Sequence, residues 1–337
     1  MTAEPIAIRG MPGSPYTRKM LAVLRYRRIA YRYLMVSPGE GGLPKPKVEL
    51  LPTFFLPGPD GVLEAVVDST PIIRRLETMV SGRRVVPDDP ALRFLDELIE
   101  DYADEWLTKP MFHYRWSYEA DIAKAAGVLP RWRNMLGDET ALRAAGDAFA
   151  ERQIGRLGVV GSNAVTGPVI EASYRRFLAL FESHLAAHRF LLGARPGAAD
   201  FAAFGQLTQL THFDPTPSAI ALAEAPRVYA WVDMVEDLSG LEPAEDDWLQ
   251  NPADLRPMLA EIGRTYAPVM LANAKALADG ADKVETTVDG QAWVQAPFPY
   301  QAKALQWLRA SFQALSPSEK DRVSGVIEGS GCEALLA

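Results

Sequence analysis

Residues 5–20, PIAIRGMPGSPYTRKM, carry the signals that decide how this chain folds. Pro5–Arg9 is short and β-prone, and the turn residues Gly10–Gly13 end it. Ser14 and Pro15 then favour the start of a helix, because serine caps free backbone N–H groups and proline is tolerated in the first helical turn. Apolar residues at helical spacing follow at Met20, Val23 and Leu24. The stretch therefore predicts a strand, a tight turn and a helix.

Strand and helix signals continue to alternate up to residue 80. The elements expected there are strands at 30–36, 53–56 and 62–67, a loop rich in glycine and proline at 37–47, a turn at 57–61, and a helix that begins at Asp68-Ser69-Thr70-Pro71 and runs through Met79. The two strands on either side of the turn predict a β-hairpin. Residues 1–80 are thus expected to form a compact α/β domain.

The rest of the chain is expected to be mainly helical. Residues 81–90 contain several glycine, proline and aspartate residues and are interpreted as a linker. Residues 91–263 show apolar residues at helical spacing throughout and predict an all-helical domain. Residues 264–337 are interpreted as an appended segment with helices and a β-hairpin at about 284–295, because Asp289-Gly290 is a strong two-residue turn signal.

The composition excludes several classes of protein. The 337 residues include 35 Lys and Arg against 43 Asp and Glu, a net charge of −8, which argues against a nucleic-acid binder. The single cysteine, Cys332, excludes a disulfide framework within one chain. No apolar run approaches the roughly 20 residues of a membrane helix, and the first residues lack the features of a signal peptide. We expect a soluble, cytoplasmic protein with no nucleic-acid or membrane partner.

Ser14 has two interpretations. In the structural one, it is a helix cap and nothing more. In the functional one, it is a hydroxyl at the amino end of a helix, where free N–H groups and the helix dipole favour an anion such as a thiolate. Ser14 is too weak an acid to be a nucleophile without a base. Its hydroxyl can still donate a hydrogen bond to the thiolate of a ligand, and such a bond lowers the pKa of that thiol.

The helix start at residues 68–71 repeats this arrangement. In the structural interpretation, Ser69 or Thr70 is simply the cap. In the functional interpretation, this helix end holds a ligand carboxylate while Asp68 binds a ligand ammonium group. Two such helix starts in one small domain suit a zwitterionic peptide that carries a thiol.

These pieces, taken together, resemble a cytosolic glutathione transferase over the chain up to about residue 250. The matching pieces are Ser14-Pro15-Tyr16-Thr17-Arg18-Lys19, Leu51-Pro52, Asp68-Ser69-Thr70-Pro71-Ile72, and Phe190-Leu191-Leu192-Gly193 followed by Ala199-Asp200-Phe201. The resemblance implies an α/β plus all-α fold, with a thioredoxin-like N-terminal domain followed by a helical-bundle C-terminal domain. It also implies a homodimer.

The resemblance implies a glutathione site in the N-terminal domain, with glutathione as co-substrate. Ser14 resembles the serine that hydrogen-bonds the glutathione sulfur in serine-type members, and Tyr16 lies beside it as a further glutathione contact. Pro52 matches a cis-proline of the family. Leu51, the residue before it, matches the position whose backbone pairs with the cysteinyl part of glutathione.

The two ends of glutathione are also implied by the resemblance. Asp68 and Ser69 match the positions that bind the γ-glutamyl amino group and carboxylate. Lys45 or Lys47 is the candidate for the glycyl carboxylate, although their proline- and glycine-rich loop does not align with the family.

An aromatic cluster in the first helices of the C-terminal domain is the candidate electrophile site. Its members are Trp106, Met111, Phe112, Tyr114, Arg115 and Trp116. The resemblance places the electrophile in this region, whereas an aromatic stripe at helical spacing is also typical of a buried core. His184 and His188 have a spacing that can hold a metal ion, but no third ligand is apparent, so no metal is expected.

Several features depart from the family, among them a longer turn between Pro52 and Gly61 and a longer helical domain. Gly197 stands where the family has serine or threonine, three residues before Asp200, and glycine is a weaker helix cap. Asp200 itself is expected to be structural. The segment after residue 264 has no counterpart in ordinary members.

Three functions remain open. The leading hypothesis is a serine-type glutathione transferase that stabilises the glutathione thiolate for attack on a small hydrophobic electrophile. The main alternative is a transferase-like fold that binds a ligand or partner without catalysis. A glutathione-dependent reductase or lyase would need Cys332 to fold back into the cleft.

Overall fold

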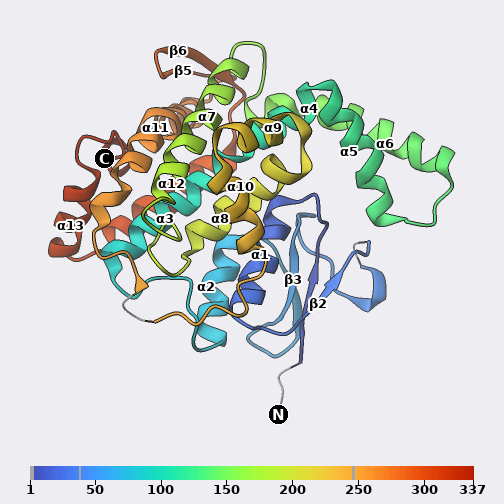
Figure 1. Ribbon diagram of the computed structural model, residues 1–337, viewed down its shortest axis with the longest axis horizontal. Helices are drawn as coiled ribbons and strands as arrows, with labels where there is room; N and C mark the ends of the chain where they lie inside the picture. The colour runs from blue at the N-terminus through green and yellow to red at the C-terminus, as the bar shows by residue number, and fades with distance from the viewer. Residues whose placement is uncertain (1–3, 38, 245–246) are drawn as a thin grey trace.

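The computed structural model describes residues 4–37, 39–244 and 247–337. Residues 1–3 and 38 of the predicted N-terminal domain and residues 245–246 of the predicted helical domain lie outside the described residues. A small mixed sheet with two helices forms the N-terminal part, and helices form most of the remainder (Figure 1). The predicted fold class is confirmed.

The N-terminal part is built on a four-stranded sheet in the order β2-β1-β3-β4. Its elements are β1 (Ile6–Arg9), α1 (Pro15–Tyr26), β2 (Tyr31–Leu34), the short 3-10 helix η1 (Glu40–Gly42), β3 (Thr53–Pro57), β4 (Leu63–Val66) and α2 (Ser69–Met79). Strand β1 runs parallel to β2 and antiparallel to β3. Ile8 and Phe54 are opposite each other on neighbouring strands and are fully buried, together with Met20 and Leu24 of α1.

Helix α1 is also fixed from the other side, by α8 (Ala198–Leu207). A β-carbon at Gly205 of α8 would lie 2.5 Å from the carbonyl oxygen of Pro15. Only glycine allows α8 to approach the first turn of α1 this closely, since real side chains do not tolerate such a distance. The position of Ser14 therefore depends on the packing between the two domains.

Helices form the middle of the chain. They are α3 (Pro90–Glu105), α4 (Thr108–Ser117), α5 (Glu119–Arg133), α6 (Glu139–Ile154), η2 (Leu157–Val160), α7 (Gly167–His184), α8, the π-helical turn η3 (Thr208–Phe213), α9 (Pro215–Glu224), α10 (Pro226–Val235), η5 (Pro252–Leu255) and α11 (Arg256–Asp279). Helices α5 and α6 project from the rest of the molecule (Figure 1). No helix within the described ranges is long and apolar enough to cross a membrane.

Asp200 is buried at the start of α8 and holds the preceding turn. Its carboxylate accepts hydrogen bonds from the backbone N–H groups of Leu191 (2.7 Å) and Gly197 (2.9 Å). Burial raises the pKa of Asp200 to about 7. Gly197 has no side chain to cap the helix, and Asp96 of α3 takes that role by accepting from the N–H group of Ala199 at 2.9 Å.

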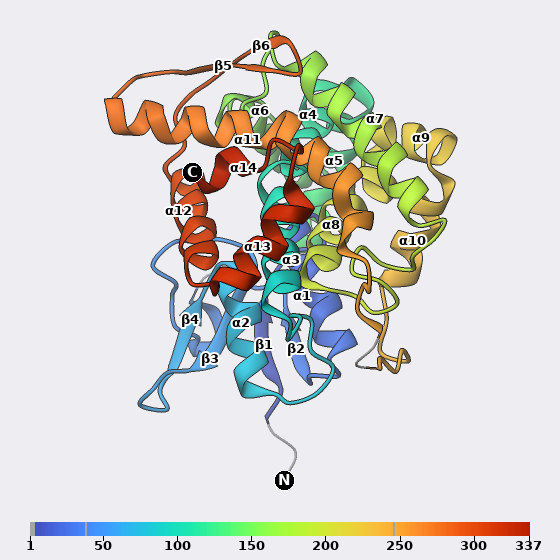
Figure 2. The same cartoon turned by 90° about the vertical axis from the view of Figure 1, so that its left-hand side faces the viewer.

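The C-terminal segment continues from the helical domain without a break. The expected domain boundary between residues 263 and 264 falls inside α11. The elements that follow are β5 (Val284–Val288), β6 (Gln291–Gln295), α12 (Pro299–Gln313), α13 (Pro317–Ile327) and α14 (Glu333–Leu336). Strands β5 and β6 pair as a hairpin around Asp289 and Gly290, both of which have positive φ, as a two-residue turn requires. Helices α12 and α13 pack over α3, next to α2 (Figure 2).

Candidate active site

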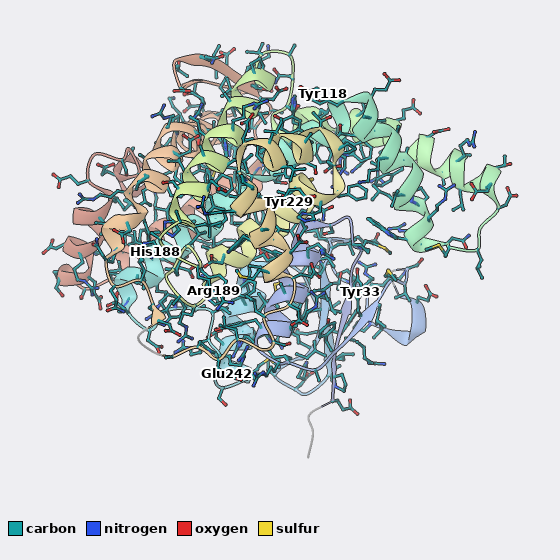
Figure 3. All side chains as sticks on the ribbon, viewed as in Figure 1. Tyr33, Tyr118, His188, Arg189, Tyr229 and Glu242 are labelled. Atoms are coloured by element: carbon teal, nitrogen blue, oxygen red, sulfur yellow. The ribbon has the colours of Figure 1, made fainter. Side chains whose placement is uncertain are left out.

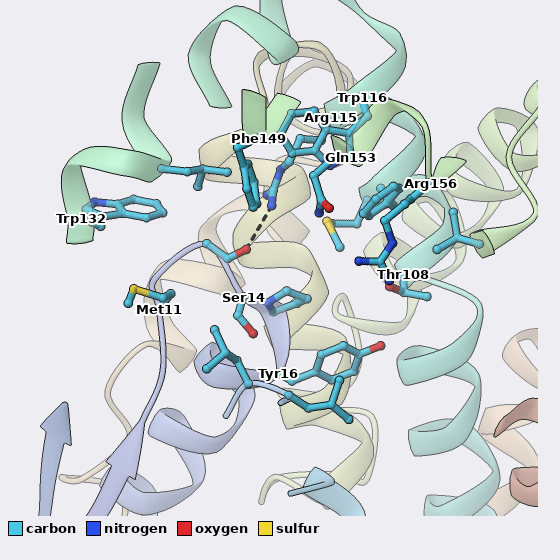
Figure 4. Close-up of a pocket in the computed structure, with 18 of the residues that line it drawn as sticks. Met11, Ser14, Tyr16, Thr108, Arg115, Trp116, Trp132, Phe149, Gln153 and Arg156 are labelled. Carbon is cyan, nitrogen blue, oxygen red and sulfur yellow. Dashed lines mark hydrogen bonds between the residues drawn. The ribbon is translucent and has the colours of Figure 1, made fainter. Parts of the chain in front are cut away.

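A cavity of about 550 Å³ lies at the amino end of α1. Ser14 and Tyr16 line it from the N-terminal domain (Figure 4), as does Leu51. The opposite walls come from α4, α5 and α6 and are mostly apolar, with the aromatic side chains Phe112, Trp116, Trp132 and Phe149. The cavity thus joins a helix N-terminus to an aromatic chamber between the two domains.

Ser14 caps α1 and faces the cavity at the same time. Its hydroxyl oxygen accepts a hydrogen bond from the N–H group of Thr17 at 3.2 Å. This bond uses a lone pair of the oxygen and leaves the hydroxyl proton free, because a serine hydroxyl is both donor and acceptor. The structural and functional interpretations of Ser14 are therefore compatible.

Arg115 holds the loop that precedes Ser14. Its guanidinium is buried, forms an ion pair with Asp214 (2.8 Å), and donates to the carbonyl oxygen of Gly13 at 3.0 Å (Figure 4). Gln209 accepts from the same guanidinium at 2.8 Å and donates to the carbonyl oxygen of Pro12 at 3.2 Å. Arg115 lines the cavity, as the sequence led us to expect, but its charge is already paired.

Tyr16 faces the cavity with its hydroxyl already engaged. The hydroxyl donates to the backbone carbonyl of Asp104 at 2.8 Å. Burial, followed by the nearby carboxylates of Glu105 and Asp104, raises the pKa of Tyr16 well above its usual range. The phenol therefore stays protonated and contributes a wall to the cavity.

The peptide bond between Leu51 and Pro52 is cis, as the family resemblance implies. Leu51 lines the cavity, and among the described residues its backbone N–H and carbonyl groups have no hydrogen-bond partner. Lys45 and Lys47 are exposed and do not line the cavity. The structure thus brings Leu51 to Ser14 but leaves both lysines outside.

Side chains from other parts of the chain contact Asp68 and Ser69 at the start of α2. Tyr300, from α12 in the C-terminal segment, donates its hydroxyl to Oδ2 of Asp68 at 2.8 Å. Ser69 is buried, and its hydroxyl accepts from Nζ of Lys19 at 3.1 Å. Neither Asp68 nor Ser69 is among the residues that line the cavity.

A cluster of buried charges lies between α1, α2 and α3. Lys19 forms ion pairs with Glu100 (2.9 Å) and Asp104 (2.6 Å). Burial acts to lower the pKa of Lys19, but the two carboxylates prevail and raise it. Burial raises the pKa of Asp104 to about 6 and, with help from the carboxylates of Asp101 and Asp104, that of Glu105 to about 8.

The expected electrophile residues divide into two groups. Met111, Phe112, Arg115 and Trp116 line the cavity. Trp106 and Tyr114 do not, and the expectation for them needs correction. The indole N–H of Trp106 donates to Ser173 within the core and its ring packs against Trp293, while Tyr114 stacks on Tyr118. Trp106, which directly follows α3, contacts α7 and β6, and Tyr114 of α4 also packs against α7.

The cavity residues that the sequence did not identify include Trp132, Phe149, Gln153 and Arg156. They come from α5, α6 and the residues just after α6, which project from the body of the molecule. A helical pattern indicates which residues share one face of a helix. It does not indicate that a face of α5 or α6 forms part of a cavity wall. No local signal marked these residues.

The remaining histidines and the cysteine lie elsewhere. His184 hydrogen-bonds the carbonyl oxygen of Phe190, and His188, labelled in Figure 3, pairs with Asp254 at 3.1 Å. In the part of the chain that the structure describes, no group of three or more His, Cys, Asp or Glu side chains is placed to hold a metal ion. Cys332 is buried against α11, where its thiol donates to the carbonyl oxygen of Leu259, and burial raises its pKa to about 11. It does not line the cavity, which removes the basis for a cysteine-dependent function.

Two family models match the chain. Residues 9–84 match the N-terminal domain of glutathione S-transferase, and residues 118–233 match the C-terminal domain of glutathione S-transferase. No protein of curated function shows a significant match.

Several solved structures are similar at low sequence identity. A glutathione transferase family member from Pseudomonas fluorescens, with two glutathione bound, is 16% identical, with 68% of this chain and 88% of that chain covered and a TM-score of 0.41. A glutathione S-transferase from Methylobacterium radiotolerans, in complex with glutathione sulfonate, is 18% identical, with 69% and 90% covered and a TM-score of 0.40. FzlA from C. crescentus is 18% identical, with 72% and 98% covered and a TM-score of 0.42.

Proposed function

Because the chain belongs to the glutathione S-transferase superfamily, we propose that it binds glutathione and delivers its thiolate to a small electrophile in the aromatic chamber. The observation that carries the proposal is Ser14, whose hydroxyl faces the cavity at the amino end of α1. The sulfur lies next to this hydroxyl, where the helix dipole also favours negative charge.

The cysteinyl part of glutathione lies along Leu51. The free N–H and carbonyl groups of this residue offer the ligand backbone a pair of hydrogen bonds, as one strand offers another. From there the sulfur reaches Ser14, since both residues line one cavity.

The chemistry is nucleophilic attack by the thiolate. Each pKa unit by which the bound thiol is lowered corresponds to about 1.4 kcal/mol of thiolate stabilisation, and a fall from about 8.5 to about 6.5 makes the thiol mostly ionised at neutral pH. With chlorodinitrobenzene as electrophile, the sulfur–carbon bond forms, the carbon–chlorine bond breaks, and chloride leaves with the electron pair.

The γ-glutamyl end lies at the start of α2. Tyr300 occupies only one oxygen of Asp68, so the other oxygen is available for the ligand ammonium group. The hydroxyl proton of Ser69 is likewise free for a carboxylate, since its oxygen accepts from Lys19. Tyr300 then keeps the Asp68 carboxylate in place.

Replacing Ser14 tests the proposal. We expect Ser14→Ala to keep glutathione binding, measured by calorimetry, and to lose about ten-fold in turnover for each unit by which the pKa of the bound thiol rises. Ser14→Thr should retain most of the activity. Turnover at the wild-type rate in Ser14→Ala would reduce Ser14 to a helix cap.

The variant also loses a cap, which costs about 0.5–2 kcal/mol of stability. Ser316→Ala is the matched control, because Ser316 caps α13 by accepting from the N–H group of Glu319 and does not line the cavity. It should show a similar loss of stability without the loss of turnover.

One observation favours the alternative of a fold that lacks transferase activity. Both side chains at the start of α2 already have internal partners, Tyr300 for Asp68 and Lys19 for Ser69. If glutathione does not bind in calorimetry while circular dichroism shows an intact fold, this alternative replaces the proposal. The resemblance also implies a homodimer, which light scattering on the purified protein tests. The cytoplasmic location expected from the sequence is tested by cell fractionation.

A further inference from the structure

The charges that line the cavity are all of one sign. Three arginines, Arg115, Arg133 and Arg156, are among the lining residues, and none of the described lining residues is an aspartate or a glutamate. The chain as a whole is acidic, with a net charge of −8. A cavity of this kind attracts anions wherever its arginines have no carboxylate partner.

The three arginines differ in what they are free to bind. Arg115 is buried and paired with Asp214. The side chains of Arg133 and Arg156 are exposed and have no hydrogen-bond or ion-pair partner among the described residues. Arg133 ends α5 and lines the same cavity as Leu51.

Arg156 lies on the other side of the cavity. It follows α6 directly, and its guanidinium extends towards Thr108, with Gln153 beside it (Figure 4). Trp132 and Met11 are at the opposite end of the same view, and Ser14 lies between. A ligand that reaches Arg156 therefore extends from the sulfur position, across the aromatic walls, to a free cation.

We propose that the second substrate is an aromatic electrophile that carries a carboxylate, and that Arg156 selects it by binding this group. This proposal rests on the proposed function and names its substrate class. A guanidinium binds a carboxylate through two parallel hydrogen bonds, and the aromatic walls bind the ring. The bond from sulfur to carbon forms at the end of the ring nearest Ser14, and the leaving group departs from that carbon with its electron pair.

A matched pair of electrophiles tests the proposal. Chloronitrobenzoate and chloronitrobenzamide have nearly the same shape and both lose chloride to a thiolate, but only the first is charged. After correction for the uncatalysed rates, the wild-type protein should prefer the benzoate in kcat/KM. Arg156→Gln should reduce that preference about ten-fold or more, and added salt should weaken it in the wild type.

Arg152→Gln is the control, because Arg152 is an exposed arginine one turn earlier that does not line the cavity. It should retain the wild-type preference. An unchanged preference in Arg156→Gln would overturn the proposal. So would an equal loss for both electrophiles together with weaker glutathione binding, since Arg156 would then bind a carboxylate of glutathione.

Binding measurements separate this proposal from the proposed function. Quenching of tryptophan fluorescence by the benzoate and the benzamide follows binding directly, because Trp116 and Trp132 line the cavity. If the protein catalyses no conjugation but Arg156→Gln still removes a preference for the benzoate, the proposed function fails and the carboxylate site stands. If the wild type binds both compounds equally, the carboxylate site fails.

Discussion

At Gly197, a side chain from a neighbouring helix makes the capping hydrogen bond that the residue itself cannot make. The backbone of Gly197 has an extended conformation that any residue adopts, with φ −95° and ψ 178°, so glycine is not required for its torsion angles. It is required for space. A β-carbon there would lie 2.6 Å from Oδ1 of Asp96 and 2.9 Å from Cγ of Leu192. The Asp96 carboxylate occupies the place of the missing cap side chain and makes its hydrogen bond.

We therefore expect Gly197→Ala to destabilise the protein by about 1–3 kcal/mol, because the added methyl group must displace Asp96 or Leu192. The free energy of unfolding in urea measures this loss. Gly240→Ala is the control, since a β-carbon at Gly240 meets nothing within 4 Å. Equal stability of the two variants would show that Asp96 does not need this space.

At the scale of elements, the sequence predicted structures with local signals and missed contacts between distant elements. Ser14 and Pro15 begin α1, and Asp289-Gly290 forms the turn of the β5–β6 hairpin, because capping and turn formation depend on adjacent residues. Helical spacing does not distinguish a residue in a cavity wall from a residue in the buried core. The sequence therefore predicts a pocket position for Trp106, which lies in the core. The helix that follows Trp106, α4, is buried on several sides, since even its polar residues Lys109 and His113 are buried from solvent.

Tyr300 is the clearest of the missed contacts, since no pattern around α12 relates it to α2. The contact makes the C-terminal segment part of the candidate site. We expect Tyr300→Phe to weaken glutathione binding about three- to ten-fold, because a hydrogen bond that holds the Asp68 carboxylate is worth about 0.5–1.5 kcal/mol. Calorimetric titration with glutathione measures the change.

Tyr229→Phe serves as the control, because Tyr229 lies in α10 and does not line the cavity. Tighter glutathione binding in Tyr300→Phe would contradict this expectation. It would mean that Tyr300 obstructs the start of α2 instead of orienting Asp68.

At the scale of the whole molecule, the buried carboxyl groups of α3 make stability depend on pH. The pKa of Glu105 is raised to about 8, mainly by burial. Between its ordinary pKa near 4.5 and this raised value, the folded protein holds a proton that the unfolded chain has released. The unfolded state then binds fewer protons, so the free energy of unfolding falls as pH rises through this range.

We expect Glu105→Gln to flatten this dependence, because glutamine resembles the protonated carboxyl group and stays neutral at every pH. Glu105 alone contributes a slope of at most about 1.4 kcal/mol per pH unit. The variant should therefore gain stability relative to the wild type as the pH is raised from 6 to about 8. Urea unfolding at several pH values measures the slope, with the exposed Glu151→Gln as control. Parallel curves for the wild type and Glu105→Gln would contradict the assignment.

The bond between Tyr300 and Asp68 has a consequence for biosynthesis, because its partners are 232 positions apart in the chain. At about 5–20 residues per second, a ribosome takes roughly 10–50 s to advance from one to the other. Throughout that interval Asp68 has been synthesised and Tyr300 has not, so this hydrogen bond forms only after most of the chain has been made.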